Sequence, residues 1–134
     1  SSGIISDGIF LYIKNSLAMA VEMCFDRYMD GHGLNKDDYI LDHHILPIRK
    51  WNPGPGMGPH CDNYDGHSNL AFSMVTYLND DYSGGEINFP NHGITIKPIS
   101  GSTIMFPSVE PFVHEVRPIA EGYRYAMATS VLRK

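Results

Sequence analysis

Two histidines and one aspartate have the residue types and the spacing of a metal site. His60 and Asp62 are two positions apart, so on an extended strand the imidazole and the carboxylate point to the same side. A further histidine, His114, follows much later in the chain. Two histidines and one carboxylate on one side of an ion form the facial triad of non-haem Fe(II) centres. Because so short a motif also arises by chance, the spacing alone leaves this site a hypothesis.

Small residues on two expected strands indicate a pocket for an anion. Alternate residues of a strand face opposite sides, so each of these strands has a small face and a bulky face. The small residues are Ala71, Ser73, Val75, Ala126, Ala128 and Ser130, and Arg124 shares a face with the last three. Turned inward, these faces would leave a void and an unpaired buried charge. A small anionic ligand would resolve both problems; a β-bulge or a solvent-exposed small face is the alternative.

One helix followed by short strands would have to position these residues. Apolar residues recur every three or four positions over residues 9–28, with Asp7 available as the N-cap and an end expected near Gly31 or Gly33. The apolar positions are Phe10, Ile13, Leu17, Val21, Cys24 and Tyr28. Strands are predicted at residues 39–48, 70–78, 86–89, 94–97, 103–106, 112–116 and 123–132. Residues 51–60, dense in Gly and Pro, are expected to be an irregular loop.

This order of elements favours one mainly β domain over residues 1–134. A helix at about residues 9–30 would pack on one sheet of a β core at about residues 38–132. With 134 residues, of which 43% are hydrophobic, the chain can bury a core without disulfides or a structural metal. Its two cysteines, Cys24 and Cys61, are too few for a disulfide framework and are compatible with a reducing compartment.

The charge balance and the apolar pattern limit the partners. The net charge is -5 and no basic block is present, so a nucleic acid is not expected as a partner. No apolar run approaches the roughly 18 residues of a membrane span. The first residues lack the charged start and apolar run of a signal peptide. The expectation is a cytoplasmic protein with no membrane partner.

Four segments together resemble a known enzyme family. They are PHCDN (59–63), YLNDDYSGGEINFP (77–90), ISGSTIMFPS (99–108) and HEVRPIAEGYRYA (114–126). In this order and spacing they resemble the 2-oxoglutarate- and Fe(II)-dependent dioxygenase superfamily, in particular its prolyl 4-hydroxylase-like members, over about residues 46–132. The resemblance implies a double-stranded β-helix, or jelly-roll, which agrees with the expected strands.

The resemblance implies roles for individual residues. His60, Asp62 and His114 would be the iron ligands. Arg124 would pair with the distal carboxylate of the cosubstrate 2-oxoglutarate, and Tyr77 would add a hydrogen bond to it. Dioxygen would be the second cosubstrate, with ascorbate as an accompanying reductant. The substrate-side candidates are Trp51, Met57 and Asn63.

The implied reaction is hydroxylation of an unactivated C–H bond, with peptidyl proline in a peptide or protein as the first choice of substrate. Prolyl hydroxylases of this kind usually carry tyrosines where this chain has Trp51 and Met57, and a Trp where it has Ser130. Three alternatives stay open: an oxygenase acting on another residue or a small molecule, a cupin-like metal protein without oxygenase activity, and a peptide-binding module.

The other histidines and one acidic pair have structural interpretations. Either member of the pair His43 and His44 is expected to be hydrogen-bonded in a strand, and His32 to cap carbonyls at a helix end. Solvated turns are expected around His67 and His92, with a place on the open side of the metal site as the alternative for His67. The pair Asp80 and Asp81 precedes two glycines and is most simply a turn.

Overall fold

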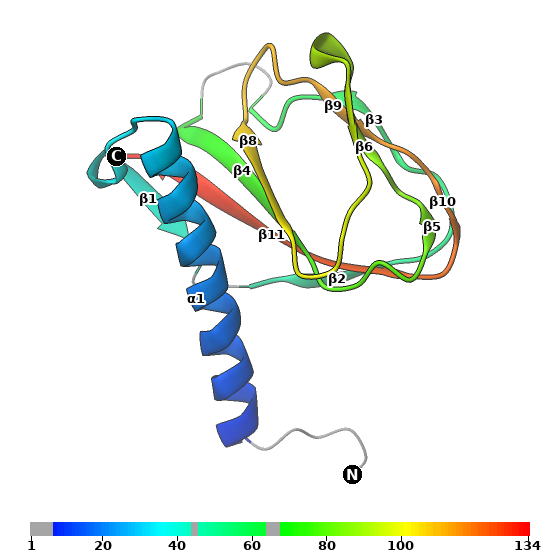
Figure 1. The fold of residues 1–134 in the computed structure, drawn as a ribbon, viewed down its shortest axis with the longest axis horizontal. Coiled ribbons are helices and arrows are strands. Elements are labelled where there is room, and N and C mark those ends of the chain that lie inside the picture. Colours follow the sequence, from blue (N-terminus) through cyan, green and yellow to red (C-terminus); the bar gives the residue numbers. More distant parts are fainter. Residues whose placement is uncertain (1–6, 44–45, 64–67) are drawn as a thin grey trace.

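One long helix precedes a body built from strands (Figure 1). The computed structural model describes residues 7–43, 46–63 and 68–134, with side chains described from residue 15 onward. The elements are α1 (Asp7–Gly31), η1 (Lys36–Asp38), β1 (Tyr39–Asp42), β2 (Ile48–Trp51), β3 (Met57–His60), β4 (Leu70–Tyr77), β5 (Ser83–Gly84), β6 (Ile87–Phe89), η2 (Pro90–His92), β7 (Ile94–Ile96), β8 (Thr103–Pro107), β9 (His114–Val116), β10 (Ile119–Glu121) and β11 (Arg124–Arg133).

The strands form two larger antiparallel sheets and one small sheet. In the first sheet the order is β1-β11-β4-β8, and β2 also pairs with β11. The second sheet has the order β3-β9-β6-β7, and β5 pairs with β10. Figure 1 shows the first sheet beside α1 and the second sheet on the far side of the body from the helix. This arrangement confirms the predicted mainly β jelly-roll with an N-terminal helix packed on one sheet.

The main core lies between α1 and the first sheet. On the helix, Val21, Phe25 and Met29 are buried. They pack against the bulky faces of β4 and β11, which contribute Phe72, Met74, Met127 and Val131. Burial of one such side chain stabilises the fold by about 1.5–3 kcal/mol. The predicted alternation is therefore observed on these two strands, except that Ala71, placed on the small face, is also buried in this core.

The C-terminal end of α1 is closed by a glycine motif. The amide of Leu34 donates to the carbonyl of Met29 at 2.9 Å, and the amide of Gly33 donates to that of Asp30 at 3.2 Å. Gly33 has a φ of 65°, the left-handed conformation that this motif requires. The predicted end is thus confirmed. Asp7, predicted as the N-cap, is instead the first helical residue.

The strand predicted at residues 39–48 is right only in its first part, since β1 ends at Asp42 and the next strand, β2, covers residues 48–51 and lies almost wholly beyond the predicted range. β1 pairs with the C-terminal part of β11 and β2 with its N-terminal part. Pro47 lies directly before β2 and has no N–H to donate to a ladder, which is consistent with the interruption. The other six predicted strands agree with the structure to within two residues at each end.

The loop expected at residues 51–60 contains a strand. β3 pairs with β9, a partner far along the chain, which local patterning around Gly58 and Pro59 does not indicate. The short pair β5 and β10 was also not predicted. Within the second sheet, Ile87 and Phe89 pack with Phe106 of β8 in a smaller core. Among the described helices, none has the length and apolar character needed to cross a membrane.

Candidate metal centre and adjoining cavity

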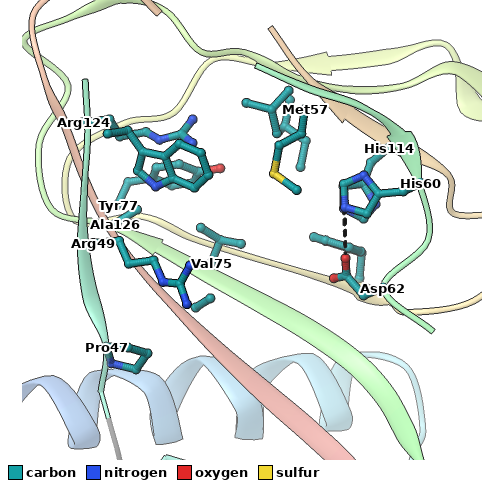
Figure 2. A pocket seen from close by; sticks show the side chains of 15 residues that line it. Pro47, Arg49, Met57, His60, Asp62, Val75, Tyr77, His114, Arg124 and Ala126 are labelled. Atoms are coloured by element: carbon teal, nitrogen blue, oxygen red, sulfur yellow. Dashed lines mark ion pairs between the residues drawn. The ribbon is translucent and has the colours of Figure 1, made fainter. Parts of the chain in front are cut away.

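The three candidate metal ligands meet at the ends of two paired strands. His60 ends β3 and His114 begins β9, and the two residues lie opposite each other in the antiparallel register. Asp62 follows His60 by two residues, and its Oδ1 lies 3.2 Å from Nε2 of His60 and 3.5 Å from Nε2 of His114. One ligand atom from each residue lies within 4.8 Å of the other two. Figure 2 shows the three side chains grouped on one side of the cavity.

Backbone carbonyls orient both imidazoles. Nδ1 of His60 lies 2.9 Å from the carbonyl oxygen of Gly58, and Nδ1 of His114 lies 3.2 Å from that of Phe112. Because a carbonyl only accepts, each Nδ1 carries the hydrogen, and Nε2 keeps the lone pair in the neutral ring. Both Nε2 atoms face Asp62, so the three donors fit a borderline metal ion such as Fe(II).

Ser73 contacts the second oxygen of Asp62, and Ser108 contacts Ser73. Ser73 Oγ donates to Asp62 Oδ2 at 2.5 Å, and Ser108 Oγ lies 2.7 Å from Ser73 Oγ. Both serines are buried. Ser73 is on the small face predicted for residues 70–78, but neither serine has a predicted role. The alternation of β4 could have indicated Ser73, whereas Ser108 comes from a loop after β8 and carried no signal.

Burial and charge pairing act in opposite directions on Asp62 and His114. Burial raises the pKa of Asp62, but hydrogen bonds from His114 and Ser73 and the nearby imidazoles outweigh it and lower the pKa below its usual value. Burial lowers the pKa of His114, but its hydrogen bonds to Asp62 and Phe112 and the charge of Asp62 outweigh this effect and raise the pKa. The triad therefore favours an ionised carboxylate, as metal binding requires.

A cavity of about 420 Å³ adjoins the triad and extends toward Arg124. Small residues provide the room, as the alternation predicted, because Val75, Ala126 and Ala128 line the cavity. The larger apolar residues in its wall include Trp51, Met57, Ile87, Phe106 and Val116. Ser130, predicted on the same face, is not among the lining residues. The triad and Arg124 thus lie on opposite sides of one mostly apolar space (Figure 2).

Arg124 is a buried cation with spare hydrogen-bonding capacity. Its side chain is 5% exposed, and Nη1 donates to the carbonyl of Gly85 at 3.2 Å. Nε has no hydrogen-bond partner among the described residues. The ring of Trp51 lies 4.8 Å from Cζ of Arg124. A buried guanidinium without a carboxylate partner fits the binding of an anion, and the cavity offers the space for one.

Tyr77 lies beside Arg124 and stays protonated. The side chain is 3% exposed and lines the cavity. Burial raises the pKa of Tyr77 to about 12, although the charge of Arg124 acts in the opposite direction. Its hydroxyl is therefore a donor at any physiological pH. Tyr77 and Arg124 together can bind one carboxylate.

The amino-acid sequence matches the model of a family whose members are named for a metal ion and a carboxylate cosubstrate. The sequence model of the 2OG-Fe(II) oxygenase superfamily matches residues 46–131, more than half of the chain. The chain belongs to the 2OG-Fe(II) oxygenase superfamily. The superfamily is named for Fe(II) and 2-oxoglutarate, and the triad and the Arg124 side of the cavity have the chemistry to hold such a metal ion and such a carboxylate.

Similar proteins within the superfamily are hydroxylases. A PKHD-type hydroxylase of Synechococcus sp. (strain CC9902) is 31% identical over 119 residues, which cover 85% of this chain and 51% of the relative. The chain thus spans about half the length of this curated relative. Among solved structures, a prolyl-4-hydroxylase of Pseudomonas putida is 26% identical with a TM-score of 0.57, over 65% of this chain and 50% of that one.

A more distant structure shares the fold. The viral collagen prolyl hydroxylase of Paramecium bursaria Chlorella virus-1, solved as a complex with 2-oxoglutarate, has a TM-score of 0.65. It is 18% identical, and the match covers 85% of this chain and 71% of the viral chain. At this identity the likeness concerns the jelly-roll fold.

The three substrate-side candidates differ in position. Trp51 and Met57 line the cavity, and Met57 is 40% exposed at its edge. Asn63 is buried and does not line the cavity. Its side-chain amide donates to the carbonyls of Ser68 and Leu70, and its Oδ1 accepts from the amide of Ser68. The structure therefore corrects the expectation for Asn63, which secures the chain on either side of residues 64–67.

The remaining polar candidates lie outside the cavity. His43 contacts Glu22 at 2.6 Å, and Nδ1 of His32 lies 2.8 Å from the carbonyl oxygen of Tyr28, which confirms a structural role for both histidines. His92 is exposed in η2. The carboxylate of Asp80 accepts a hydrogen bond from the backbone amide of Ser100. The predictions for His44 and His67 concern residues outside the described ranges.

Proposed function

We propose that this protein hydroxylates proline residues in a peptide or protein, with 2-oxoglutarate and dioxygen as cosubstrates. The observation that carries the proposal is the placement of the His60, Asp62 and His114 triad and the Arg124 and Tyr77 pair on opposite sides of one cavity. Membership of the superfamily and the prolyl hydroxylases among the similar structures support the reaction type. The choice of peptidyl proline rests on these relatives and on the apolar cavity edge.

The chain's residues divide the work between metal and cosubstrate. His60, Asp62 and His114 would hold Fe(II), with their Nε2 and Oδ1 atoms facing one point. Bound Fe(II) supplies the redox chemistry by which 2-oxoglutarate, dioxygen and a C–H group become succinate, carbon dioxide and an alcohol. Arg124 and Tyr77 would bind the distal carboxylate of 2-oxoglutarate through charge and a phenolic hydrogen bond.

The walls of the cavity contribute by excluding water. Ile87 and Phe106 are buried and line the space between the two sides. Removing water strengthens the interaction of Arg124 with a carboxylate and protects the reacting groups from side reactions. At the edge, Trp51 and Met57 present apolar surface that suits the ring of a proline substrate. These contacts would orient the substrate toward the triad.

An anaerobic titration tests the oxygenase assignment. Purified protein is titrated with Fe(II) and 2-oxoglutarate, the absorption of the complex is recorded, and succinate is measured after oxygen is admitted. We expect His114→Ala to lose Fe(II) binding and Arg124→Gln to bind Fe(II) but to lose affinity for 2-oxoglutarate. Absence of both a coloured complex and succinate formation in the wild type would refute the oxygenase assignment.

A peptide panel tests the substrate. Proline-containing peptides are incubated with the loaded enzyme and analysed by mass spectrometry for the gain of one oxygen atom on proline. Twin peptides with alanine in place of proline are the controls, and we expect them to remain unmodified. Equal oxidation of both twins, or succinate formation without modification of any peptide, contradicts peptidyl proline as the substrate.

A further inference from the structure

Arg49 is a second arginine of the cavity, and the register of β2 places it there. In the pairing of β2 with β11, Trp51 lies opposite Arg124 and Arg49 lies opposite Ala126. Opposed residues of an antiparallel pair share a face, and Ala126 lines the cavity. Arg49 is likewise a lining residue, and Figure 2 shows its side chain extending from β2 on the side of the cavity that faces the triad.

Arg49 differs from Arg124 in exposure and in its contacts. Arg124 is buried beside Tyr77, whereas Arg49 is exposed at the edge of the cavity. Among the described residues, no ion pair or hydrogen bond involves the Arg49 guanidinium, and Asp62 is the one carboxylate that lines the cavity. Asp62 is already engaged by the two histidines and by Ser73. Among the described residues of this cavity, Arg49 therefore has no anion to pair with.

The charges of the loaded cavity leave Arg49 unbalanced. This step rests on the proposed function. The two positive charges of Fe(II) and that of Arg124 are matched by the negative charge of Asp62 and the two of 2-oxoglutarate. Arg49 then adds one positive charge beside an apolar wall, where a charge interacts more strongly than in bulk water. The next ligand to enter the cavity is the substrate.

We infer that Arg49 recognises an anionic group of the substrate, and that the substrate is an acidic peptide with an Asp or Glu close to the hydroxylated residue. A guanidinium can hold a carboxylate through two parallel hydrogen bonds, which fixes orientation as well as position. The protein has a net charge of -5, so its surface as a whole does not attract anions. Discrimination in favour of an acidic substrate would therefore come from the local charge of Arg49.

The neighbouring residue provides a matched control. Lys50 carries the same charge one position along β2 and therefore points to the opposite face. Its Nζ lies 4.3 Å from the centre of the Tyr123 ring, and it does not line the cavity. Arg49→Gln and Lys50→Gln thus remove the same charge from the same strand, once inside the cavity and once outside it.

Twin peptides test the inference on the full chain loaded anaerobically with Fe(II) and 2-oxoglutarate, so that binding is measured without turnover. The two peptides of a pair are identical except at one position beside the central residue, where one has Glu and the other Gln. The central residue is proline in one set of pairs and alanine in a second set. We expect the best Glu peptide to bind about fivefold more tightly than its Gln twin. Arg49→Gln should reduce this ratio to about one, and Lys50→Gln should retain it.

Three results would overturn the inference. The first is equal binding of the Glu and Gln twins by the wild type, which includes the case in which neither binds. The second is a Glu preference that survives Arg49→Gln, and the third is a Glu preference that Lys50→Gln loses to the same extent as Arg49→Gln. A tenfold loss of 2-oxoglutarate affinity in Arg49→Gln with the peptide preference intact would instead place Arg49 in the cosubstrate site. Succinate released on admission of air reports the proposed oxygenase activity separately, so the failure of either proposal is recognisable.

Discussion

Ser73 donates its hydroxyl hydrogen to Oδ2 of Asp62 at 2.5 Å, on the side of the carboxylate away from the two imidazoles. A serine hydroxyl has one hydrogen, so the contact of 2.7 Å between Ser73 and Ser108 must be a donation from Ser108. The two hydroxyls form a directed chain that ends on Asp62. Oδ1 is left facing the histidines, which favours binding of a metal through one carboxylate oxygen and leaves coordination positions open.

Loss of the Ser73 hydroxyl should weaken metal binding. We expect Ser73→Ala to lower the affinity for Fe(II), or for Mn(II) as a redox-stable probe, by roughly tenfold, because partners that orient a ligand contribute about that much. Calorimetric titration measures the change. The control is Thr76→Ala, on the same strand as Ser73, which removes a part-buried hydroxyl contact of 2.9 Å to Thr103 of β8. Equal effects of the two variants on metal affinity would show that Ser73 acts only through general stability.

Gly56 should be essential for positioning His60. A Cβ at Gly56 would lie 1.8 Å from the carbonyl oxygen of Val116 in β9, a distance that no side chain tolerates. We expect Gly56→Ala to separate β3 from β9, to lower the free energy of unfolding by about 2 kcal/mol or more, and to reduce metal affinity. Gly58→Ala is the control, since a Cβ there meets nothing within 4 Å. Chemical denaturation and metal titration of both variants check this, and a stable Gly56→Ala protein with normal metal binding contradicts it.

The fluorescence of Trp51 should report binding of 2-oxoglutarate. Trp51 is the single tryptophan of the chain, and its ring lies 4.8 Å from Cζ of Arg124 at the cavity wall. A carboxylate bound to Arg124 changes the field at the indole, so we expect a saturable change of emission on titration with 2-oxoglutarate. Arg124→Gln should abolish or strongly weaken the change, and succinate should compete only weakly. An unchanged emission despite calorimetrically measured binding would argue against the carboxylate lying beside Trp51.

The metal-free protein should lose stability as the pH rises above neutral. The pKa of His114 is raised above 6.5, so the stabilisation from its proton is complete below about pH 6.5 and is lost as the pH passes the raised value. The pKa of Asp62 is lowered from 3.8, so its contribution is lost only in stronger acid. Thermal melts between about pH 6 and pH 9 should show a falling midpoint for the metal-free wild type.

The matching control for this pH dependence is His114→Gln, in which the fall should be absent or much smaller. Metal binding requires the unprotonated Nε2 of His114, so the affinity for the metal should rise over the same pH range. A metal-free wild type whose melting midpoint rises with pH would contradict the pairing of His114 with Asp62.

Sequence patterns located the parts of this protein that depend on local geometry. The spacing of His60 and Asp62 places both side chains on one side of an extended segment, whatever the rest of the chain does. The alternation along residues 124–131 showed which face of a strand is small, and the cavity lies on that face. Gly33 closed the helix because a left-handed residue there needs no tertiary contact to be favourable.

Other features depended on which strands pair and could not be inferred locally. β3 exists because Met57 and His60 find partners in β9, and no pattern in a Gly- and Pro-rich segment indicates that pairing. Asn63 followed the metal motif closely enough to suggest a substrate contact, yet its amide binds the backbone of residues 68 and 70. Spacing along the chain does not decide which backbone groups remain to be satisfied after folding.

By itself the sequence indicated the reaction chemistry that is possible: a candidate iron triad, an arginine proposed to bind a carboxylate, and a jelly-roll to hold them. Only the tertiary structure decided how these groups are supported and what else shares their cavity. Ser108 reaches Asp62 through Ser73, and Arg49 faces the cavity because β2 pairs with β11 in one particular register. A shift of that register by one residue would turn Arg49 outward and Lys50 inward, and residue types alone do not distinguish the two arrangements.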